Sequence, residues 1–281
     1  MVELLWDNDI TICVNMFNGC TNITEIDLSN FDTSQVTDMG VMFANCSSLT
    51  SINFSNFDTS QSTNIGTMFS SCTSLTSLDL SSFNTSKITC IDNLFYNCFL
   101  LTSIDLSNFD TSQVTYMFKM FYNCTSLTSL DLSNFNTSKE TKMSYMFKDS
   151  TNLEYINLNN FDENKLVLYN DIFSNIKENV VICINENITN RKILPQITNI
   201  KCHMLDCSTD WKLNKIKKII IENKTECFKY SLKEIIEYIL NNERDEREKS
   251  KEKEINCYDY ILKIMKNFIF FELRLFVKIK L

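Results

Sequence analysis

The sequence predicts an α/β repeat solenoid with one parallel β-sheet, followed by a mainly helical C-terminal region. Three observations support this fold class. A Met-Phe dipeptide or a close variant of it recurs every 26 residues, and a segment of alternating apolar residues follows each copy. Hydrophobic residues make up 44% of the chain, which is enough to form a core, and three Gly and one Pro are too few for collagen-like or Pro-rich architectures.

Several columns of residues keep the same 26-residue register. The dipeptides begin at Met16, Met42, Met68, Leu94, Met120 and Met146, and Ile172-Phe173 extends the series. A cysteine lies three residues after each of the first five Phe residues, at Cys20, Cys46, Cys72, Cys98 and Cys124. Three further columns are apolar with the spacing L-x-x-L-x-L, and a Phe column and a DTS or NTS turn come next. Residues 13–162 therefore contain six copies without an insertion.

Each copy predicts one strand and one short helix. The L-x-L part alternates as a half-buried strand does, whereas V-T-x-M-x-x-M-F spaces its apolar residues by three and four, as one face of a helix does. Such a unit cannot bury its apolar side alone, so we expect successive strands to pair in parallel, with the thiols of Cys46, Cys72 and Cys98 inside. Ser62 and Glu140 interrupt the Val/Ile column, so we expect that column near the edge of the core.

The unit MFYNCTSLTSLDLSNFNTSKETKM resembles the 26-residue surface-protein repeat of the BspA-like leucine-rich-repeat family. The resemblance covers about residues 13–162. It implies a leucine-rich-repeat-like right-handed coil in a microbial cell-surface or secreted protein that binds host proteins or mediates adhesion. The family has no catalytic residues to carry over, so the resemblance implies a protein that is not an enzyme.

The repeats define three regions. Residues 1–12 form a partial N-terminal cap, residues 13–187 form the solenoid with a degenerate last coil over 164–187, and residues 188–281 form a Cys-containing region. The first region shows no secretory signal peptide, and we expect either a minimal cap or, preferably, a fragment. In the last region, residues 211–221 and 230–240 have helical spacing, and charged residues interrupt 258–281 too often for a membrane span.

Composition argues against nucleic-acid binding, metal binding and catalysis. The net charge of −8 opposes nucleic acid as a partner, and His203 is the only histidine, which leaves few general bases and metal ligands. We therefore predict no cofactor, no metal site and no catalytic residues. The repeat cysteines are expected to be inert core thiols, with disulfides or metal binding as the alternative. The cysteines at 183, 202, 207, 227 and 257 are compatible with one or two disulfides or, less well, with zinc.

Two sets of residues are candidates for partner binding. Outward strand positions place Asp79, Asp105 and Asp131 in one exposed row, diluted by Asn53 and Asn157, which is a solvated ladder or a calcium site. Aromatic residues also occupy positions that other copies fill with small or polar residues: Tyr96, Tyr116, Phe118, Tyr122 and Tyr145. Stacking should bring them together, and the two interpretations are lateral packing within the solenoid and an interface patch that binds a partner.

These features favour a non-enzymatic cell-surface or secreted protein that presents an acidic solenoid surface to a protein or glycan partner. The alternative is a structural spacer without a specific ligand. A third hypothesis makes residues 188–281 an independent module carried by the solenoid. The sequence assigns no oligomeric state.

Overall fold

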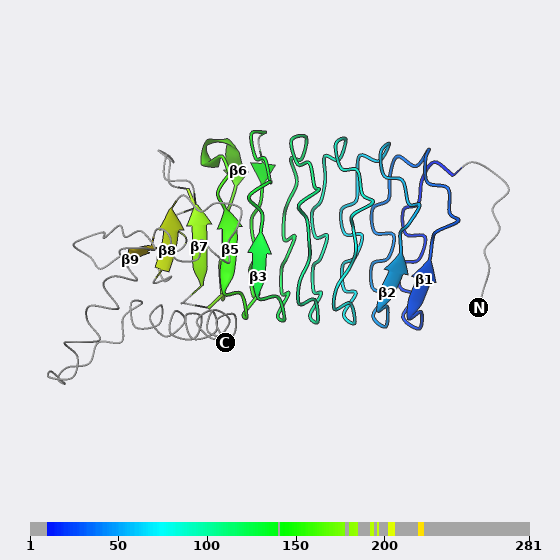
Figure 1. Ribbon diagram of the computed structural model, residues 1–281, viewed down its shortest axis with the longest axis horizontal. Helices are drawn as coiled ribbons and strands as arrows, with labels where there is room; N and C mark the ends of the chain where they lie inside the picture. The colour runs from blue at the N-terminus through cyan, green and yellow to red at the C-terminus, as the bar shows by residue number, and fades with distance from the viewer. Residues whose placement is uncertain are drawn as a thin grey trace, which may run out of the picture.

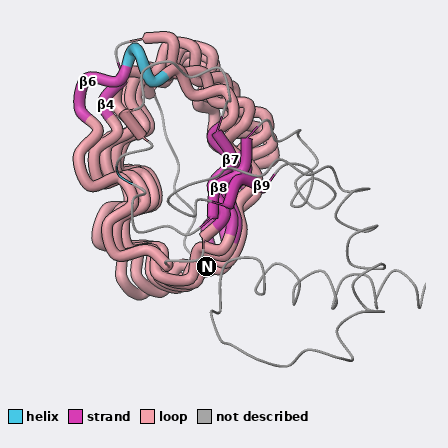
Figure 2. The backbone as a smooth tube through the Cα atoms, turned by 90° about the vertical axis from the view of Figure 1, so that its left-hand side faces the viewer, coloured by secondary structure: helices cyan, strands magenta, loops and turns pink. Residues whose placement is uncertain are grey.

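The computed structural model describes residues 10–139, 141–177, 180–184, 192–193, 196, 202–205 and 219–221. In this part of the chain, successive 26-residue repeats lie side by side along the long axis (Figure 1) and follow nearly the same path when seen end-on (Figure 2). The expectations for residues 1–9, for Glu140 and for most of 188–281 lie outside the described residues.

Short strands mark the same position in several repeats. Strand β1 (Glu25–Asp27) pairs in parallel with β2 (Ser51–Asn53). A second sheet has the order β3 (Ser129–Asp131), β5 (Tyr155–Leu158), β7 (Val181–Ile184), β8 (Cys202–Leu205) and β9 (Ile219–Ile221), and only the β8–β9 pair is antiparallel. The 3₁₀ helix Glu163–Lys165 lies between β5 and β6 (Leu166–Leu168), and β6 pairs in parallel with β4 (Thr141–Lys142).

The strand column forms two separate sheets instead of the single predicted one, because no strand is assigned between Asn53 and Ser129. In β1 and β2, Asp27 faces Asn53, and the Asn53 amide donates a hydrogen bond of 3.0 Å to the Asp27 carboxylate. In the stretch without strands, Asp79 and Asp105 occupy this same column in two successive repeats. Like charges on neighbouring strands destabilise pairing, and strands of three residues have few hydrogen bonds to offset this repulsion.

The Met-Phe segments were predicted to be helical, and this prediction is wrong. Two residues in each segment have positive φ, for example Val41 at 61° and Asn45 at 59°, and an α-helix cannot contain them. The backbone N–H groups of Val41, Phe43 and Asn45 donate instead to carbonyls of the next repeat, at 3.0, 3.0 and 2.7 Å. The N–H groups of Ala44 and Cys46 donate to carbonyls three residues earlier, so the segment is a chain of turns that alternates bonds to the next repeat with bonds inside itself.

The core is a set of columns that run through all described repeats. The Phe rings of the Met-Phe dipeptides stack from Phe17 to Phe173 with centroid separations from 5.4 to 6.0 Å. The thiols of Cys46, Cys72 and Cys98 are buried, as the pattern predicts. The Cys72 thiol donates to the Phe43 carbonyl at 3.1 Å, and burial raises the pKa of the Cys46 thiol to about 11.

Buried hydroxyls also link the repeats. The Thr59 side chain donates to the Asn84 carbonyl at 2.9 Å and accepts from the Asn84 N–H at 2.8 Å. The expectation that the Val/Ile column lies at the edge of the core is wrong, because Ser62 is fully buried. Its hydroxyl donates to the carbonyls of Thr37 and Asn64, and these bonds offset the cost of burying it.

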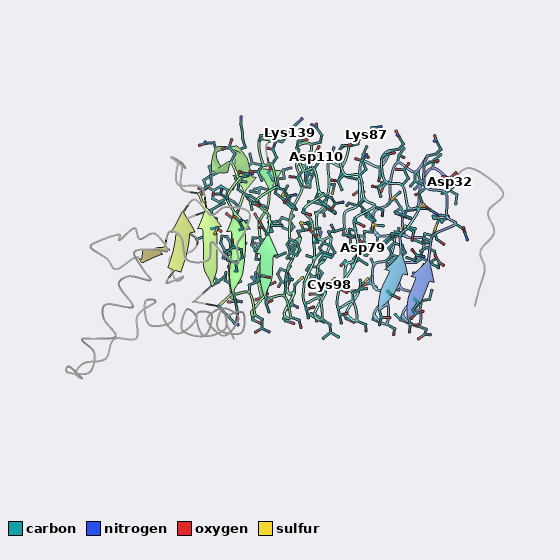
Figure 3. The ribbon with its side chains drawn as sticks, in the orientation of Figure 1. Asp32, Asp79, Lys87, Cys98, Asp110 and Lys139 are labelled. Carbon is teal, nitrogen blue, oxygen red and sulfur yellow. The ribbon has the colours of Figure 1, made fainter. Side chains whose placement is uncertain are left out.

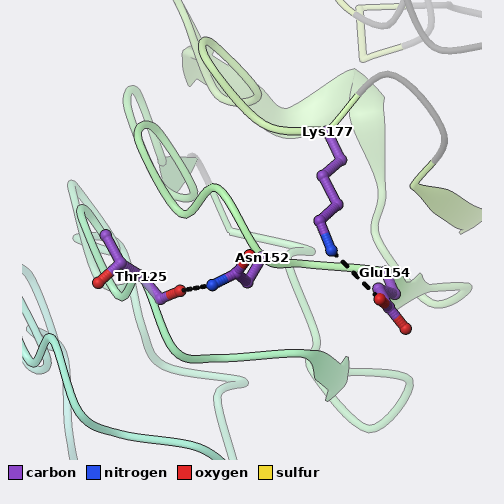
Figure 4. A network of polar contacts seen from close by, with 4 residues as sticks. All are labelled: Thr125, Asn152, Glu154 and Lys177. Atoms are coloured by element: carbon purple, nitrogen blue, oxygen red, sulfur yellow. Dashed lines mark hydrogen bonds and ion pairs between the residues drawn. The ribbon is translucent and has the colours of Figure 1, made fainter.

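Most of the side-chain hydrogen bonds between repeats at the surface join uncharged groups, and Figure 4 shows one such bond beside an ion pair. The Asn152 amide donates to the Thr125 carbonyl at 2.6 Å, one repeat earlier. Lys177 and Glu154 form the only ion pair found among the described residues, with 3.2 Å between Nζ and Oε1. Exposed ion pairs contribute little to stability, so hydrogen bonds and core packing hold the repeats together.

The sheet continues past residue 187, the predicted end of the solenoid. Strand β8 pairs in parallel with β7, and β9 closes this edge in the antiparallel direction. Residues 211–221 were predicted to be helical, yet Ile219–Ile221 is a strand, consistent with the preference of consecutive β-branched residues for extended structure. The other helical predictions for residues 222–281 fall outside the described residues.

Candidate partner-binding surface

The Met-Phe segments present a side of the molecule whose backbone repeats while its side chains change. Isolated parallel bridges join Asp38 to Asn64, Asn64 to Cys90, Cys90 to Tyr116, and Tyr116 to Lys142. The same backbone position therefore holds acidic, amide, thiol, aromatic and basic side chains in succession. Because the backbone bonds are made in every repeat, the side chains on this face are free to differ.

Four of the predicted aromatic residues form two ring pairs on this face. The Tyr96 and Tyr122 rings are stacked, with centroids 5.0 Å apart and an interplanar angle of 19°. The Phe118 and Tyr145 rings meet edge-on, with centroids 5.5 Å apart and an angle of 82°. Both pairs connect neighbouring repeats, so part of the lateral packing that the sequence left open is present.

Lys119 joins the two ring pairs. Its Nζ lies 5.8 and 5.6 Å from the ring centroids of Tyr96 and Tyr122, and 5.3 and 5.7 Å from those of Phe118 and Tyr145. Each distance falls within the range of a cation–π contact. One ammonium group is thus shared by four rings from three successive repeats.

Two more lysines extend the cluster. The Lys142 Nζ lies 4.5 Å from the Tyr116 ring centroid and 3.4 Å from its hydroxyl oxygen, and the Lys148 Nζ lies 5.4 Å from the Tyr145 centroid. We define the aromatic–lysine patch by Tyr96, Tyr116, Phe118, Lys119, Tyr122, Lys142, Tyr145 and Lys148. Our sequence analysis missed the lysines. The sequence did contain a signal for a basic patch, because residues 115–150 include four lysines, whereas Lys87 is the only basic residue in 10–114.

The patch is accessible to water. Tyr116 is 45% exposed, and the other seven side chains are half-buried. The Tyr122 phenol donates a hydrogen bond to Asp149, and this bond raises the pKa of Tyr122. The patch therefore offers ammonium and phenol donors above partly covered rings.

The acidic row lies elsewhere. Strand β3, which contains Asp131, and strand β4, which contains Lys142, belong to sheets on opposite sides of the end-on view (Figure 2). Asp79 (Figure 3) and Asp105 are exposed, and Asp131 is half-buried. The structure thus divides the predicted site residues into two groups.

Each acid of the row belongs to a turn. The Asp79 and Asp105 carboxylates accept the N–H of the serine two residues later, both at 2.9 Å, and hydrogen bonds from those serines lower the pKa values of both acids. Asn157 was expected in the exposed row, but it is fully buried, and its Nδ2 has no hydrogen-bond partner among the described residues. This expectation is wrong because both faces of β5 are buried, whereas β1 and β2 expose their outward residues.

The described part of the chain contains no group of three or more His, Cys, Asp or Glu residues arranged to hold a metal ion. A search of the same residues found no helix with the length and hydropathy of a membrane span. Cys183 is disulfide-bonded, in agreement with the disulfide alternative for the C-terminal cysteines.

Comparison with known proteins places the repeats in a family. A family model described as "Mycoplasma protein of unknown function, DUF285" matches residues 11–103 and again residues 93–200. The chain belongs to the DUF285 family. The two DUF285 matches together span the patch and the acidic row, and they end near the start of β8. No curated protein and no solved structure matches the chain.

Proposed function

We propose that this DUF285 chain is a non-enzymatic binding protein of a cell surface or of the secreted fraction, and that it presents one side of its stacked repeats to a protein or glycan partner. The observation that carries this proposal is the aromatic–lysine patch. Tyr116 is 45% exposed in a column that other repeats fill with Asp, Asn, Cys or Lys. Binding energy in interfaces concentrates at clustered aromatic side chains.

We propose in addition that the stacked repeats are a right-handed solenoid of the BspA-like leucine-rich-repeat type. The 26-residue offset of the hydrogen bonds that join repeats, such as the 2.8 Å bond from the Thr50 N–H to the Thr24 carbonyl, supports this assignment. So do the buried Leu, Phe and Cys columns. In a solenoid each repeat contacts only its neighbours, which produces an extended surface of the kind a binding protein uses.

The disulfide at Cys183 supports a location outside the reducing cytosol. Disulfides persist in secreted and surface proteins and are rare in cytosolic ones. Mass-spectrometric peptide mapping of the unreduced protein would identify the partner cysteine.

A structural spacer is the second candidate, and the lateral ring packing favours it. The stacked Tyr96 and Tyr122 rings and the shared Lys119 ammonium hold three repeats together without any ligand. Aromatic pairs contribute about 0.5–1.5 kcal/mol beyond the area that they bury. If that were their whole purpose, the patch would stiffen the stack and bind nothing.

Replacing two rings distinguishes the two candidates. The full chain is tested for binding to a panel of extracellular proteins and glycans, and the best ligand is then titrated with the double variant Tyr96→Ala/Tyr122→Ala. We expect binding to weaken by about 2 kcal/mol or more. Loss of the ring pair is expected to lower the free energy of unfolding by about 0.5–1.5 kcal/mol for the ring–ring contact, in addition to the contribution of the area that the rings bury.

Phe99→Ala provides the matched control, since Phe99 is a half-buried aromatic outside the patch whose column holds Thr73 and Thr125 in other repeats. It is expected to leave binding unchanged. If affinity and stability fall in parallel in both variants, or if no member of the panel binds, the spacer hypothesis replaces the binding one.

A further inference from the structure

We propose that the aromatic–lysine patch binds a sulfated glycan, a proposal that rests on the binding function above and specifies its ligand. The first argument is charge. The chain carries a net charge of −8, but the patch contributes Lys119, Lys142 and Lys148 from two adjoining repeats. A locally basic surface on an acidic molecule selects an anionic partner and disfavours a neutral one.

The second argument is preorganisation. The Lys119 ammonium is held among four rings at 5.3–5.8 Å, and the Lys142 ammonium lies 4.5 Å from the Tyr116 centroid. Packing against rings removes part of the rotamer freedom that a free lysine side chain would lose on binding. The phenol groups beside these lysines add donors suited to the several acceptor oxygens of a sulfate group.

The acids around the patch are already engaged. Asp92 accepts from the Asn93 amide at 2.8 Å and from the Cys90 thiol, and Asp149 accepts from the Asn175 amide at 2.7 Å and from Tyr122. They belong to the repeats at the two ends of the patch. Asp171, one repeat after Tyr145, accepts from the Ser174 hydroxyl at 2.9 Å. Because these carboxylates already accept hydrogen bonds, we expect the anionic groups of a ligand to contact the three ammonium groups of the patch.

The backbone argues against an acidic peptide as the ligand. A peptide that adds to a sheet needs unpaired backbone groups along an edge. Here the N–H groups of Met117, Lys119 and Phe121 donate to carbonyls of the next repeat at 2.9, 3.1 and 2.9 Å, so no edge is free along the patch. Recognition must then use side chains. The three lysines occupy three different columns of two adjoining repeats, so a ligand with several anionic groups, such as a sulfated glycan, fits this surface.

The test titrates the full chain by calorimetry with three probes, a heparin-derived decasaccharide, a neutral dextran oligosaccharide of equal length and decaglutamate. We expect saturable binding of the sulfated decasaccharide that weakens with added salt because screening acts on exposed charges, and much weaker binding of the other two. Lys119→Gln/Lys142→Gln is expected to weaken it about tenfold or more by removing two charge-assisted contacts. Lys119→Arg keeps the charge, and this variant is expected to bind the decasaccharide as the wild type does.

Lys87→Gln/Lys139→Gln is the matched control. Both lysines are exposed, Figure 3 shows them at the upper edge of the stack, and the pair removes the same charge. No binding of the decasaccharide, or an equal loss in the control pair at unchanged melting temperature, would overturn the proposal. Equal or tighter binding of decaglutamate would overturn the glycan assignment alone and leave the binding function standing. That function fails separately, in the panel experiment.

Discussion

Single residues in the cysteine column show how one position works in every repeat. The buried Cys98 thiol donates to the Phe69 carbonyl at 3.1 Å, and Cys124 repeats this bond to Phe95 at 3.0 Å. Ser150 takes the same position one repeat later and donates to the Phe121 carbonyl at 2.6 Å. The column therefore requires a small side chain with a donor, and burial, which raises the pKa of Cys124 to about 12, keeps these thiols protonated.

This requirement gives a prediction for Cys98. Cys98→Ser keeps the donor and should lower the free energy of unfolding by about 1 kcal/mol or less. Cys98→Val removes the donor and adds volume to a packed column, which should cost about 1–3 kcal/mol. Urea denaturation of the two variants measures the difference. A valine variant as stable as the serine variant would show that packing alone decides this position.

At the scale of the structural elements, the turn after the strand position of a repeat contains a carboxylate or amide side chain that accepts a backbone hydrogen bond. Asp27, Asp79 and Asp105 accept hydrogen bonds from the serine two residues later, and these bonds lower the pKa values of the three acids. Asn53 accepts the same bond from the Ser55 N–H at 3.1 Å. A group whose pKa is lower in the folded state contributes stability that is complete above its unfolded pKa, about 3.9 for Asp, and is lost as the pH falls through the folded value.

Asp79→Asn should therefore change how stability depends on pH. The variant keeps the acceptor but cannot titrate, so its stability should fall less than that of the wild type between about pH 4 and pH 2. Chemical denaturation midpoints at several pH values test this. Asp105→Asn, in the next repeat, removes a carboxylate with the same 2.9 Å bond and a lowered pKa, and should behave in the same way. Parallel pH curves for the wild type and Asp79→Asn would refute the assignment.

The Met-Phe segment shows where sequence reasoning reached its limit. The columns of Met, Phe, Cys and Leu correctly predicted most of the buried side chains of the inner repeats, whereas Phe17, Cys20 and Leu78 are only half-buried. Spacings of three and four also occur in a chain of turns, so the period did not reveal the positive φ values at Val41 and Asn45. Nor did it reveal that Lys119 lies among four rings, since two of those rings, Tyr96 and Tyr145, are 23 and 26 residues away in the sequence.

The burial of Asn157 was also beyond the sequence. Its column holds exposed residues at Asp27 and Asn53, and nothing in the repeat distinguishes it from them. The strand that contains it differs from β1 and β2 in being buried on both faces. A difference that arises from the surroundings of one repeat cannot be read from the repeat itself.

For the whole molecule, the central claim is that the repeats form one regular stack whose side carries the binding patch. Outward positions 26 residues apart should then be separated in proportion to the number of repeats between them. Thr24, Thr102, Thr128 and Glu154 are all exposed members of one column. At about 4.8 Å per repeat, the pairs of Thr24 with the other three should lie about 14, 19 and 24 Å apart.

Electron-spin distance measurements on the full chain test this claim most directly. Nitroxide-bearing amino acids are introduced by genetic encoding at Thr24 together with Thr102, Thr128 or Glu154 in turn, so that the native cysteines stay unchanged. A regular stack predicts three narrow distributions whose means rise by about 5 Å from one pair to the next. Distances that do not increase with the number of intervening repeats would contradict the stacked architecture, and with it the surface from which the function is proposed.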